Sequence, residues 1–333
     1  MRSLCPSLVA DPILDKIYLV TDDRPKEFRA AIHYGENIDM TSVASGVQLI
    51  VTPLTGTTGA EIRGVNLHEQ LDPATVDEIR RALVEYKVIF FPGQHLTTEE
   101  HLAFAAQCGE ITEAHPISRG NHGHPGLHEI DYSAIRKSYA GRQDALRKPR
   151  RDGWHTDVTF METPPMGSIL NALAMPEHGG DTVFANTEAA YEGLSPQFRE
   201  FLDGLVAVHD GEEAFGQGLR ADGYAEWDGK RFTAFTPVEH PLVRTHPESG
   251  KKCLFVNPEF TSHIKGFSRR ESDGILELLY EHMIHQKYLV RYNWREGDLG
   301  FWDNRATMHF VVVDYADQHR LIQRVTLKGE RPF

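Results

Sequence analysis

Residues 154–160 read Trp-His-Thr-Asp-Val-Thr-Phe, and this stretch decides how the rest of the chain is interpreted. Alternate side chains of a strand project from the same face, so we expect His155 and Asp157 to point the same way and to be able to bind one ion. His309, far downstream, is the best candidate for a third ligand. Two histidines and one carboxylate form the facial arrangement that leaves three positions open on Fe(II).

Two arginines follow the third candidate ligand. Arg320 and Arg324 have an even separation, which predicts that both lie on one face of a strand. Guanidinium groups that face inward beside a metal are costly to bury without anions to pair with, so this arrangement favours anionic ligands. The alternative is that both arginines face solvent or pair with some of the 48 Asp and Glu residues.

The apolar pattern predicts one large β-rich domain. A strand pair is expected between Val47 and Arg63, a helix over 73–86, a buried strand over 88–91 and a capped helix over 97–108. After Trp154, short stretches rich in Val, Ile, Phe, Tyr and Trp are separated by Gly, Pro and Asn, which favours a β-rich α+β core with flanking helices. The predicted domain spans 47–333, and 1–46 is an N-terminal extension.

Lysine and arginine gather in a segment just before the candidate metal motif. Between residues 136 and 151 they are opposed only by Asp144, within a Gly-, His- and Pro-rich insertion near 117–151. We expect this insertion to be a loop or lid, which either presents a solvated face or attracts an anionic ligand. His122, His124 and His128 fall in its glycine-rich part, where we expect a surface loop.

Composition excludes several classes of protein. The 333 residues carry 35 Lys and Arg against 48 Asp and Glu, a net charge of −13, which opposes binding to a nucleic acid backbone. The three cysteines are too few for a disulfide framework or a thiolate zinc site. No apolar run approaches the roughly 20 residues of a membrane-spanning helix, and Pro6 interrupts any signal-peptide pattern. We therefore expect a cytoplasmic protein with no nucleic acid or membrane partner.

The candidate residues and several short motifs together resemble one family, the TauD/TfdA (taurine dioxygenase) family of Fe(II)- and 2-oxoglutarate-dependent oxygenases. The resemblance covers residues 48–333. It is carried by His155-x-Asp157, Thr182 in Gly-Gly-Asp-Thr, His309, Arg320, Arg324, Thr163-Pro164-Pro165, Trp302-Asp303-Asn304-Arg305 and Thr326-Leu327-Lys328-Gly329. It implies a double-stranded β-helix, or jelly roll, with the metal ligands at its mouth.

The resemblance also implies the cofactors. Fe(II) would be held by His155, Asp157 and His309, and 2-oxoglutarate would chelate it through its 1-carboxylate and 2-oxo group. The distal carboxylate would meet Arg320 and the Thr182 hydroxyl, which suits a bidentate guanidinium fork and one further neutral donor. One metal position would then remain for O2.

Substrate residues are implied in the same way. His115 and Arg324 match the pair that contacts a sulfonate, while Phe215 and Phe260 match aromatic residues lining that pocket. Two positions that contact the amine end of taurine in the family differ, and they carry Ser118 and Arg151 here. A cationic Arg151 would repel an ammonium group, which favours a small anionic substrate with a different tail.

The predicted activity is hydroxylation of the carbon next to a sulfonate or sulfate ester, as in taurine, an alkylsulfonate or an alkyl sulfate. The products would be an aldehyde with sulfite or sulfate, together with succinate and CO2. Alternatives are the same chemistry on a carboxylate or biosynthetic substrate, and a metal-binding jelly roll without turnover. Thr182 and Arg320 argue against the last, since they serve only the cosubstrate. We expect a homo-oligomer, a dimer or a tetramer.

Overall fold

The structure is a computed structural model that describes residues 49–113, 115, 123–131, 153–216, 225–227, 230–232, 234–315 and 317–333. All of them belong to one compact unit. The predicted extension 1–46 and most of the insertion 117–151 lie outside the described residues, so both remain predictions. Among the described helices, none has the length and apolar character that crossing a bilayer requires.

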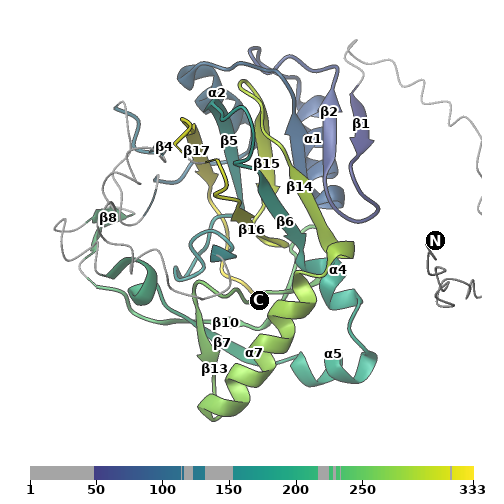
Figure 1. Ribbon diagram of the computed structural model, residues 1–333, viewed down its shortest axis with the longest axis vertical. Helices are drawn as coiled ribbons and strands as arrows, with labels where there is room; N and C mark the ends of the chain where they lie inside the picture. The colour runs from purple at the N-terminus through teal and green to yellow at the C-terminus, as the bar shows by residue number, and fades with distance from the viewer. Residues whose placement is uncertain are drawn as a thin grey trace, which may run out of the picture. The chain divides into compact units, whose positions relative to one another are not determined.

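Most of the regular structure consists of strands (Figure 1). They are β1 (Ile50–Pro53), β2 (Ala60–Arg63), β3 (Val88–Phe91), β4 (Leu127–Asp131), β5 (Gly167–Ala174), β6 (Thr182–Asn186), β7 (Val206–His209), β8 (Ala225–Trp227), β9 (Lys230–Phe232), β10 (Val238–Pro241), β11 (Val243–Thr245), β12 (Lys252–Leu254), β13 (Thr261–Ile264), β14 (Leu289–Tyr292), β15 (Leu299–Asp303), β16 (Thr307–Val311) and β17 (Leu321–Leu327). The helices are α1 (Pro73–Tyr86), α2 (Thr98–Cys108), α4 (Thr187–Glu192), α5 (Pro196–Leu202), α7 (Arg269–Met283) and the 3-10 turn η2 (Gln286–Tyr288). The predicted β-rich class with flanking helices is confirmed.

Two sheets position the candidate site. The larger has seven strands in the order β1-β2-β3-β15-β5-β17-β4, and the smaller has the order β14-β6-β16. All pairs are antiparallel except β2 with β3. Strands far apart in the sequence are neighbours in this order; for example, β17 pairs directly with β5.

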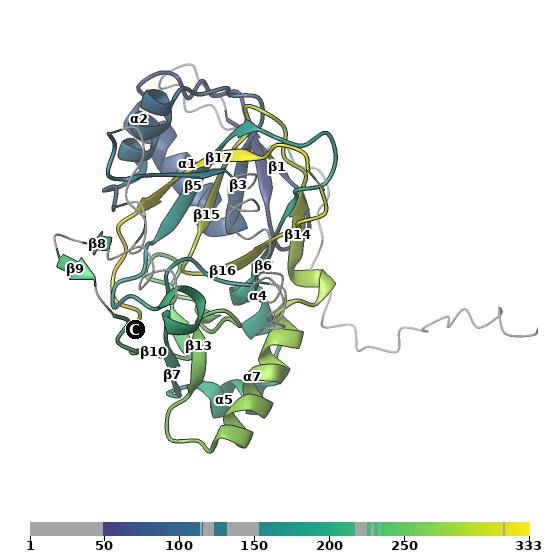
Figure 2. The same cartoon turned by 60° about the vertical axis from the view of Figure 1, so that its left-hand side comes forward.

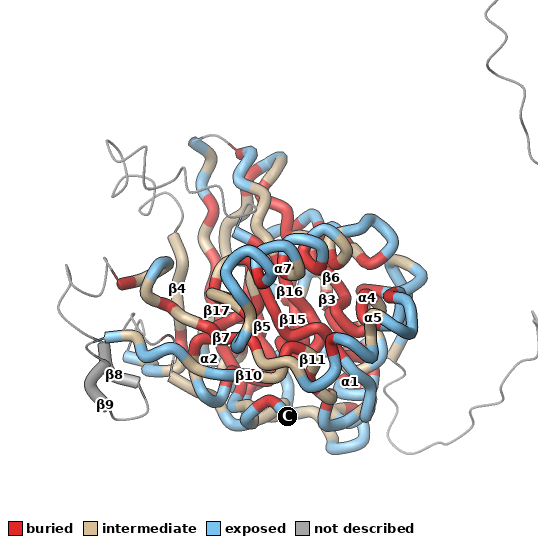
Figure 3. The backbone as a smooth tube through the Cα atoms, turned by 90° about the horizontal axis from the view of Figure 1, so that it is seen from below, coloured by how far each residue is buried: buried red, intermediate tan, exposed pale blue. Residues whose placement is uncertain are grey.

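The larger sheet has a different partner on each face. Along β3, Ile89 and Phe91 pack into a core shared with α1 and α2, which cover one face of the sheet (Figure 2). Val88 and Phe90 point the other way, into a core that also contains Phe184 of the smaller sheet. This alternation is the strand period of two, and it makes the central strands buried on both sides (Figure 3).

The first two helices form where the sequence predicts them, because each carries its own start signal. Asp72 caps α1 by accepting from the Thr75 backbone N–H, and a proline occupies the first turn. Thr97 caps α2 in a capping box with Glu100, in which each side chain bonds the other residue's backbone N–H. These caps satisfy N–H groups that a helix start otherwise leaves unpaired.

Candidate metal centre and anion pocket

The segment that carries His155 and Asp157 differs from the expected strand. His155 forms an isolated bridge to His309 on β16, with backbone bonds of 2.9 Å and 2.7 Å in the two directions. The chain then turns over residues 157–160, and Val158 has a positive φ of 56°. The bridge places the two histidines side by side, and Asp157, the first residue of the turn, lies beside them.

His155, Asp157 and His309 offer three ligand atoms that all lie within 4.8 Å of one another. The two imidazole ring centroids are 4.3 Å apart. The His155 Nδ1 atom lies 2.7 Å from the Gly153 carbonyl oxygen, so Nε2 faces the other two residues and lies 3.7 Å from Asp157 Oδ1. The structure therefore brings together the three ligands that the sequence predicts, from two separate segments.

The charge states of these groups suit a divalent metal. Burial alone would raise the pKa of Asp157, but Arg324 and the two histidines hold that pKa well below its usual range. Burial, followed by the neighbouring His155, lowers the pKa of His309 to about 3. At neutral pH the set is therefore a carboxylate with a neutral imidazole of His309, and neutral histidine and ionised carboxylate are the forms that bind metal.

The donor atoms of these three residues also suit Fe(II). His309 is buried, and its Nδ1 atom has no hydrogen-bond partner among the described residues. Two imidazoles and one carboxylate on one side of a site form the arrangement typical of non-haem Fe(II) oxygenases, with the remaining positions open. The residues present therefore fit the metal.

Each Asp157 oxygen has its own hydrogen-bond donor. The Ser168 hydroxyl on β5 donates to Oδ2 at 2.6 Å, and Arg324 Nη1 on β17 donates to Oδ1 at 2.7 Å. Sequence reasoning missed Ser168, because a single serine in an apolar strand carries no local signal. Arg324 is buried, so it does not face solvent, but it pairs with the Asp157 carboxylate, as the alternative of pairing with an acidic residue predicts.

The two residues expected to hold 2-oxoglutarate lie at the start of β6 and just before β17. Thr182 is buried, and its hydroxyl oxygen accepts from the Trp294 indole N–H at 2.9 Å. Arg320 is fully buried, and its Nε donates to the Gly180 carbonyl at 3.3 Å. Gly180 has a φ of 72°, and a Cβ there would lie 3.3 Å from Arg320 Cδ, so a glycine accommodates the arginine stem.

The expectation that Arg320 and Arg324 share one strand face is wrong. Arg320 precedes β17, and the pairing of β17 with β5 shifts register between Leu321 and Ile322. An irregularity of this kind interrupts the period of two. Both arginines are nevertheless buried, as the sequence argument for anionic ligands requires.

A second histidine joins the predicted anion pocket. His115 is buried, with its ring centroid 5.6 Å from that of His128. His128 Nδ1 lies 3.4 Å from Arg324 Nη2, because His128 and Arg324 pair across β4 and β17. The prediction of a surface loop is therefore wrong for His128, which lies in strand β4. His124 precedes the strand, and His122 lies outside the described residues.

Phenylalanines form the wall beside these groups. Phe215 lies 5.1 Å from the His115 ring, Phe260 lies 6.1 Å from the His155 ring, and the two phenylalanine rings are 5.8 Å apart, all between centroids. Phe160 lies between them, 5.6 Å from Phe215 and 4.9 Å from Phe260. The structure thus brings both predicted phenylalanines together and adds Phe160. Phe160 was not predicted from the sequence, although it is the last residue of the stretch 154–160 and lies close to Asp157 in the sequence.

Two predicted substrate residues cannot be placed. Ser118 and Arg151 both lie outside the described residues, so their contact with a substrate remains a prediction.

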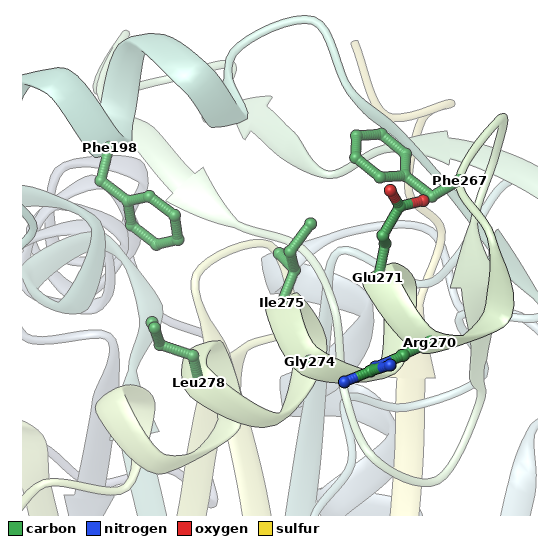
Figure 4. Close-up of a pocket in the computed structure, with 7 residues that line it drawn as sticks. All are labelled: Phe198, Phe267, Arg270, Glu271, Gly274, Ile275 and Leu278. Atoms are coloured by element: carbon green, nitrogen blue, oxygen red, sulfur yellow. The ribbon is translucent and has the colours of Figure 1, made fainter.

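A separate groove of about 400 Å3 lies between α5 and α7. Phe198 on α5 faces Ile275 and Leu278 on α7 across it (Figure 4). None of its lining residues supplies a metal ligand or belongs to the anion pocket. It is therefore not part of the site described above.

Comparison with known proteins agrees with the site. The family model described as "Taurine catabolism dioxygenase TauD, TfdA family" matches residues 50–326. An "Alpha-ketoglutarate-dependent sulfate ester dioxygenase" of Pseudomonas putida is 41% identical over 301 residues, which cover 89% of this chain and 95% of the relative. An "Alkylsulfatase" of Acinetobacter baylyi is 40% identical over 287 residues, covering 85% of this chain and 86% of the relative.

A solved structure is similar over the same region. The crystal structure of a taurine dioxygenase from Burkholderia xenovorans aligns with a TM-score of 0.71 and 41% sequence identity. The alignment covers 85% of this chain and 92% of that chain. Sequence and structure comparisons therefore agree on one family.

Proposed function

Because the chain belongs to the TauD/TfdA family of dioxygenases, we propose that it hydroxylates the carbon that carries the ester oxygen of an alkyl sulfate. It is an enzyme of the 2-oxoglutarate-dependent non-haem iron class, and it uses Fe(II), 2-oxoglutarate and O2. The observation that carries the substrate proposal is a side-chain cluster in which His128 lies next to both Arg324 and His115, with phenylalanines beside it.

The two facing sheets form the jelly roll of this proposal. The seven-stranded sheet and the sheet β14-β6-β16 share a core that includes Phe90 and Phe184. His309 belongs to the smaller sheet, while Arg324 and Ser168 belong to the larger one. The metal site would then lie at the mouth between the sheets, where side chains from both reach it.

The cofactors would be held by residues already described. His155, Asp157 and His309 would bind Fe(II), which activates O2 to oxidise a substrate C–H bond while 2-oxoglutarate becomes succinate and CO2. Arg320 and the Thr182 hydroxyl would bind the distal carboxylate of 2-oxoglutarate. Burial supports this role, because a charge-assisted pair gains strength where water is excluded.

The sulfate headgroup would bind to one guanidinium and two histidines. An arginine can only donate, so His128 Nδ1 must accept in its contact with Arg324 Nη2 and the proton of the neutral ring lies on Nε2. Burial, followed by the charge of Arg324, lowers the pKa of His128 to about 3. His115 is neutral for related reasons, since burial and then His128 hold its pKa well below the usual range. Neutral N–H groups and one guanidinium suit a monoanionic headgroup.

The tail of the substrate would lie against the aromatic wall. Val158, Phe160 and Phe260 form a buried cluster, and Phe215 and Phe235 pack against it. Removing the ammonium group of taurine from water costs more than a cation–π contact of about 0.5–2 kcal/mol returns, whereas each methylene of an alkyl chain gains about 0.8 kcal/mol on burial. This supports an alkyl sulfate over taurine, and Ser118 and Arg151 are proposed to lie near the end of the tail.

The reaction balances without another reactant. One atom of O2 enters succinate and the other is inserted into the C–H bond next to the ester oxygen. The resulting hydroxyl-bearing carbon expels sulfate as its C–O bond breaks, and the hydroxyl proton leaves as the carbonyl of an aldehyde forms. The cytoplasmic location and the assembly into a dimer or tetramer remain predictions.

A homologous series of substrates tests the proposal. From ethyl to pentyl sulfate, kcat/KM is expected to rise about fourfold for each methylene that the wall buries, and taurine should be the poorest substrate. The measurement is succinate formation together with sulfate or sulfite release, with pentanesulfonate and an aryloxyacetate as further arms. A preference for taurine or for the aryloxyacetate would overturn the sulfate ester assignment.

His128 gives a second test of the headgroup site. His128→Ala is expected to lower kcat/KM for pentyl sulfate about tenfold or more, because a hydrogen bond to a charged group contributes about 1.5–3 kcal/mol. The concentration of 2-oxoglutarate required should not change. His124→Ala is the matched control, since His124 belongs to the same segment but precedes β4. Equal losses in the two variants would remove His128 from the site.

A further inference from the structure

A buried chain of hydrogen bonds ends on the candidate metal ligand Asp157. The Trp302 indole N–H donates to Asn304 Oδ1 at 3.0 Å, and Asn304 Nδ2 donates to the Ser168 hydroxyl oxygen at 2.8 Å. The Ser168 hydroxyl then donates to Asp157 Oδ2 at 2.6 Å. All four residues are at most 2% exposed, so water does not compete for these bonds.

The direction of every bond in this chain is fixed by the chemistry of its first member. An indole N–H can only donate, so the Asn304 oxygen accepts and its amide nitrogen must point to Ser168. The serine oxygen then receives a donor, and its single proton is left for Asp157. The chain therefore delivers a donor to one oxygen of an acceptor-only carboxylate.

The strands set the positions of these residues. Ser168 on β5 pairs directly with Trp302 on β15, and the Asn304 backbone N–H donates to the Met166 carbonyl at 2.9 Å. Trp302, Ser168 and the Asn304 backbone are thus tied to the central strands of the larger sheet. Rigid strands hold a supporting group more precisely than a loop does.

This support matters because Asp157 itself lies in a turn and not in a strand. With Oδ2 occupied by Ser168, the other oxygen, Oδ1, lies on the side of His155 Nε2, 3.7 Å away. Rotation of the carboxylate would break the bond to Ser168 and leave two buried polar groups without partners, which is costly.

We propose that Ser168 is a positioning residue, oriented by Asn304 and Trp302, that holds Asp157 so that a single oxygen faces the metal. This inference rests on the proposed metal site of His155, Asp157 and His309. Hydrogen-bond partners of metal ligands commonly change metal affinity 10- to 100-fold when they are removed. The role differs from that of Arg324, which contacts the opposite oxygen.

The experiment is titration of the purified protein with Co(II) alone, followed by its visible absorption. Ser168→Ala is expected to weaken Co(II) binding about 10- to 100-fold and to change the spectrum, because a released carboxylate can bind through both oxygens. Ser272→Ala is the matched control: Ser272 is fully buried and its hydroxyl oxygen accepts from the Ile264 N–H, outside the site. That variant should bind Co(II) within about twofold of wild type.

A double-variant cycle tests the path through Asn304. Asn304→Ala is expected to weaken Co(II) binding less than Ser168→Ala, and the double variant should match Ser168→Ala within about twofold, because Asn304 acts through Ser168. Trp302 is left in place, since its ring lies 5.0 Å from that of His309. If the two losses of Co(II) affinity multiply in the double variant, Asn304 does not act through Ser168 and the proposed path is wrong.

Two further variants distinguish the positioning role from disturbed packing and from an error in the metal site. Ser168→Thr retains the hydroxyl and should keep most of the Co(II) affinity that Ser168→Ala loses. If the loss in Ser168→Ala came only from disturbed packing, Ser168→Thr would not recover it. Asp157→Ala separates the inference from its premise. If Asp157→Ala loses Co(II) and Ser168→Ala does not, the positioning role is wrong and the metal site stands. If Asp157→Ala retains wild-type affinity, the proposed metal site is wrong.

Discussion

Replacing Asp157 with alanine is expected to abolish both stoichiometric Fe(II) binding and 2-oxoglutarate decarboxylation while leaving the fold intact. The substitution removes one of three protein ligands, and it leaves the buried Arg324 guanidinium without the carboxylate that neutralises it. An unpaired positive charge in the site would then repel the metal ion, which adds to the loss of the ligand. Anaerobic Fe(II) titration and succinate formation measure the two losses.

His155→Ala and His309→Ala are expected to give the same two losses, because each also removes one ligand. Asp203→Asn is the control for removing a carboxylate, since Asp203 ends α5 and pairs with Lys252 outside the site. It should keep both activities within about twofold. Full decarboxylation in Asp157→Ala would rule out the metal assignment.

Separate losses are expected when the two buried arginines are replaced. Arg320→Ala should raise the 2-oxoglutarate concentration needed for half-maximal rate, whereas Arg324→Ala should mainly weaken the sulfate ester. Removing the charged partner of a desolvated carboxylate or sulfate costs about 2–5 kcal/mol, or a factor of at least about 30. Steady-state kinetics with each substrate varied in turn gives the two constants.

The contact between Arg324 and Asp157 sharpens this prediction. Arg324 Nη1 also donates to the Asp157 oxygen on the histidine side, so the Arg324→Ala kinetics are measured at saturating Fe(II), where a change in metal affinity does not enter the substrate constants. Arg324→Lys keeps the charge but loses the planar fork and should recover only part of the substrate affinity. If both alanine variants changed the same kinetic constant equally, the assigned division between cosubstrate and substrate would be wrong.

The residues whose roles depend on type and local pattern could be predicted from the sequence. The spacing of His155 and Asp157, the downstream His309 and the two arginines were enough to indicate a metal site with anionic ligands. The start signals at Asp72 and Thr97 predicted two helices, because caps act within a few residues. The family resemblance is confirmed by the match over residues 50–326.

Local pattern was less reliable where backbone irregularity intervened. A turn with a positive φ at Val158 replaces the expected strand, and a register shift after Leu321 separates Arg320 from the strand of Arg324. Strand alternation predicts side-chain direction only while the period of two is unbroken. A single irregular residue therefore invalidates a prediction of side-chain direction that is made by counting residues along a strand.

By itself, the sequence determined which residues are candidates for metal, cosubstrate and anion binding, since those candidates are read from residue type and short spacing. Only the tertiary structure decided that Ser168 and Arg324 flank Asp157, and that His128 joins His115. The physical reason is the pairing of distant strands: β5, β15, β17 and β4 become neighbours through sheet order and register. Register is set by packing of the whole core, which no short stretch of sequence contains.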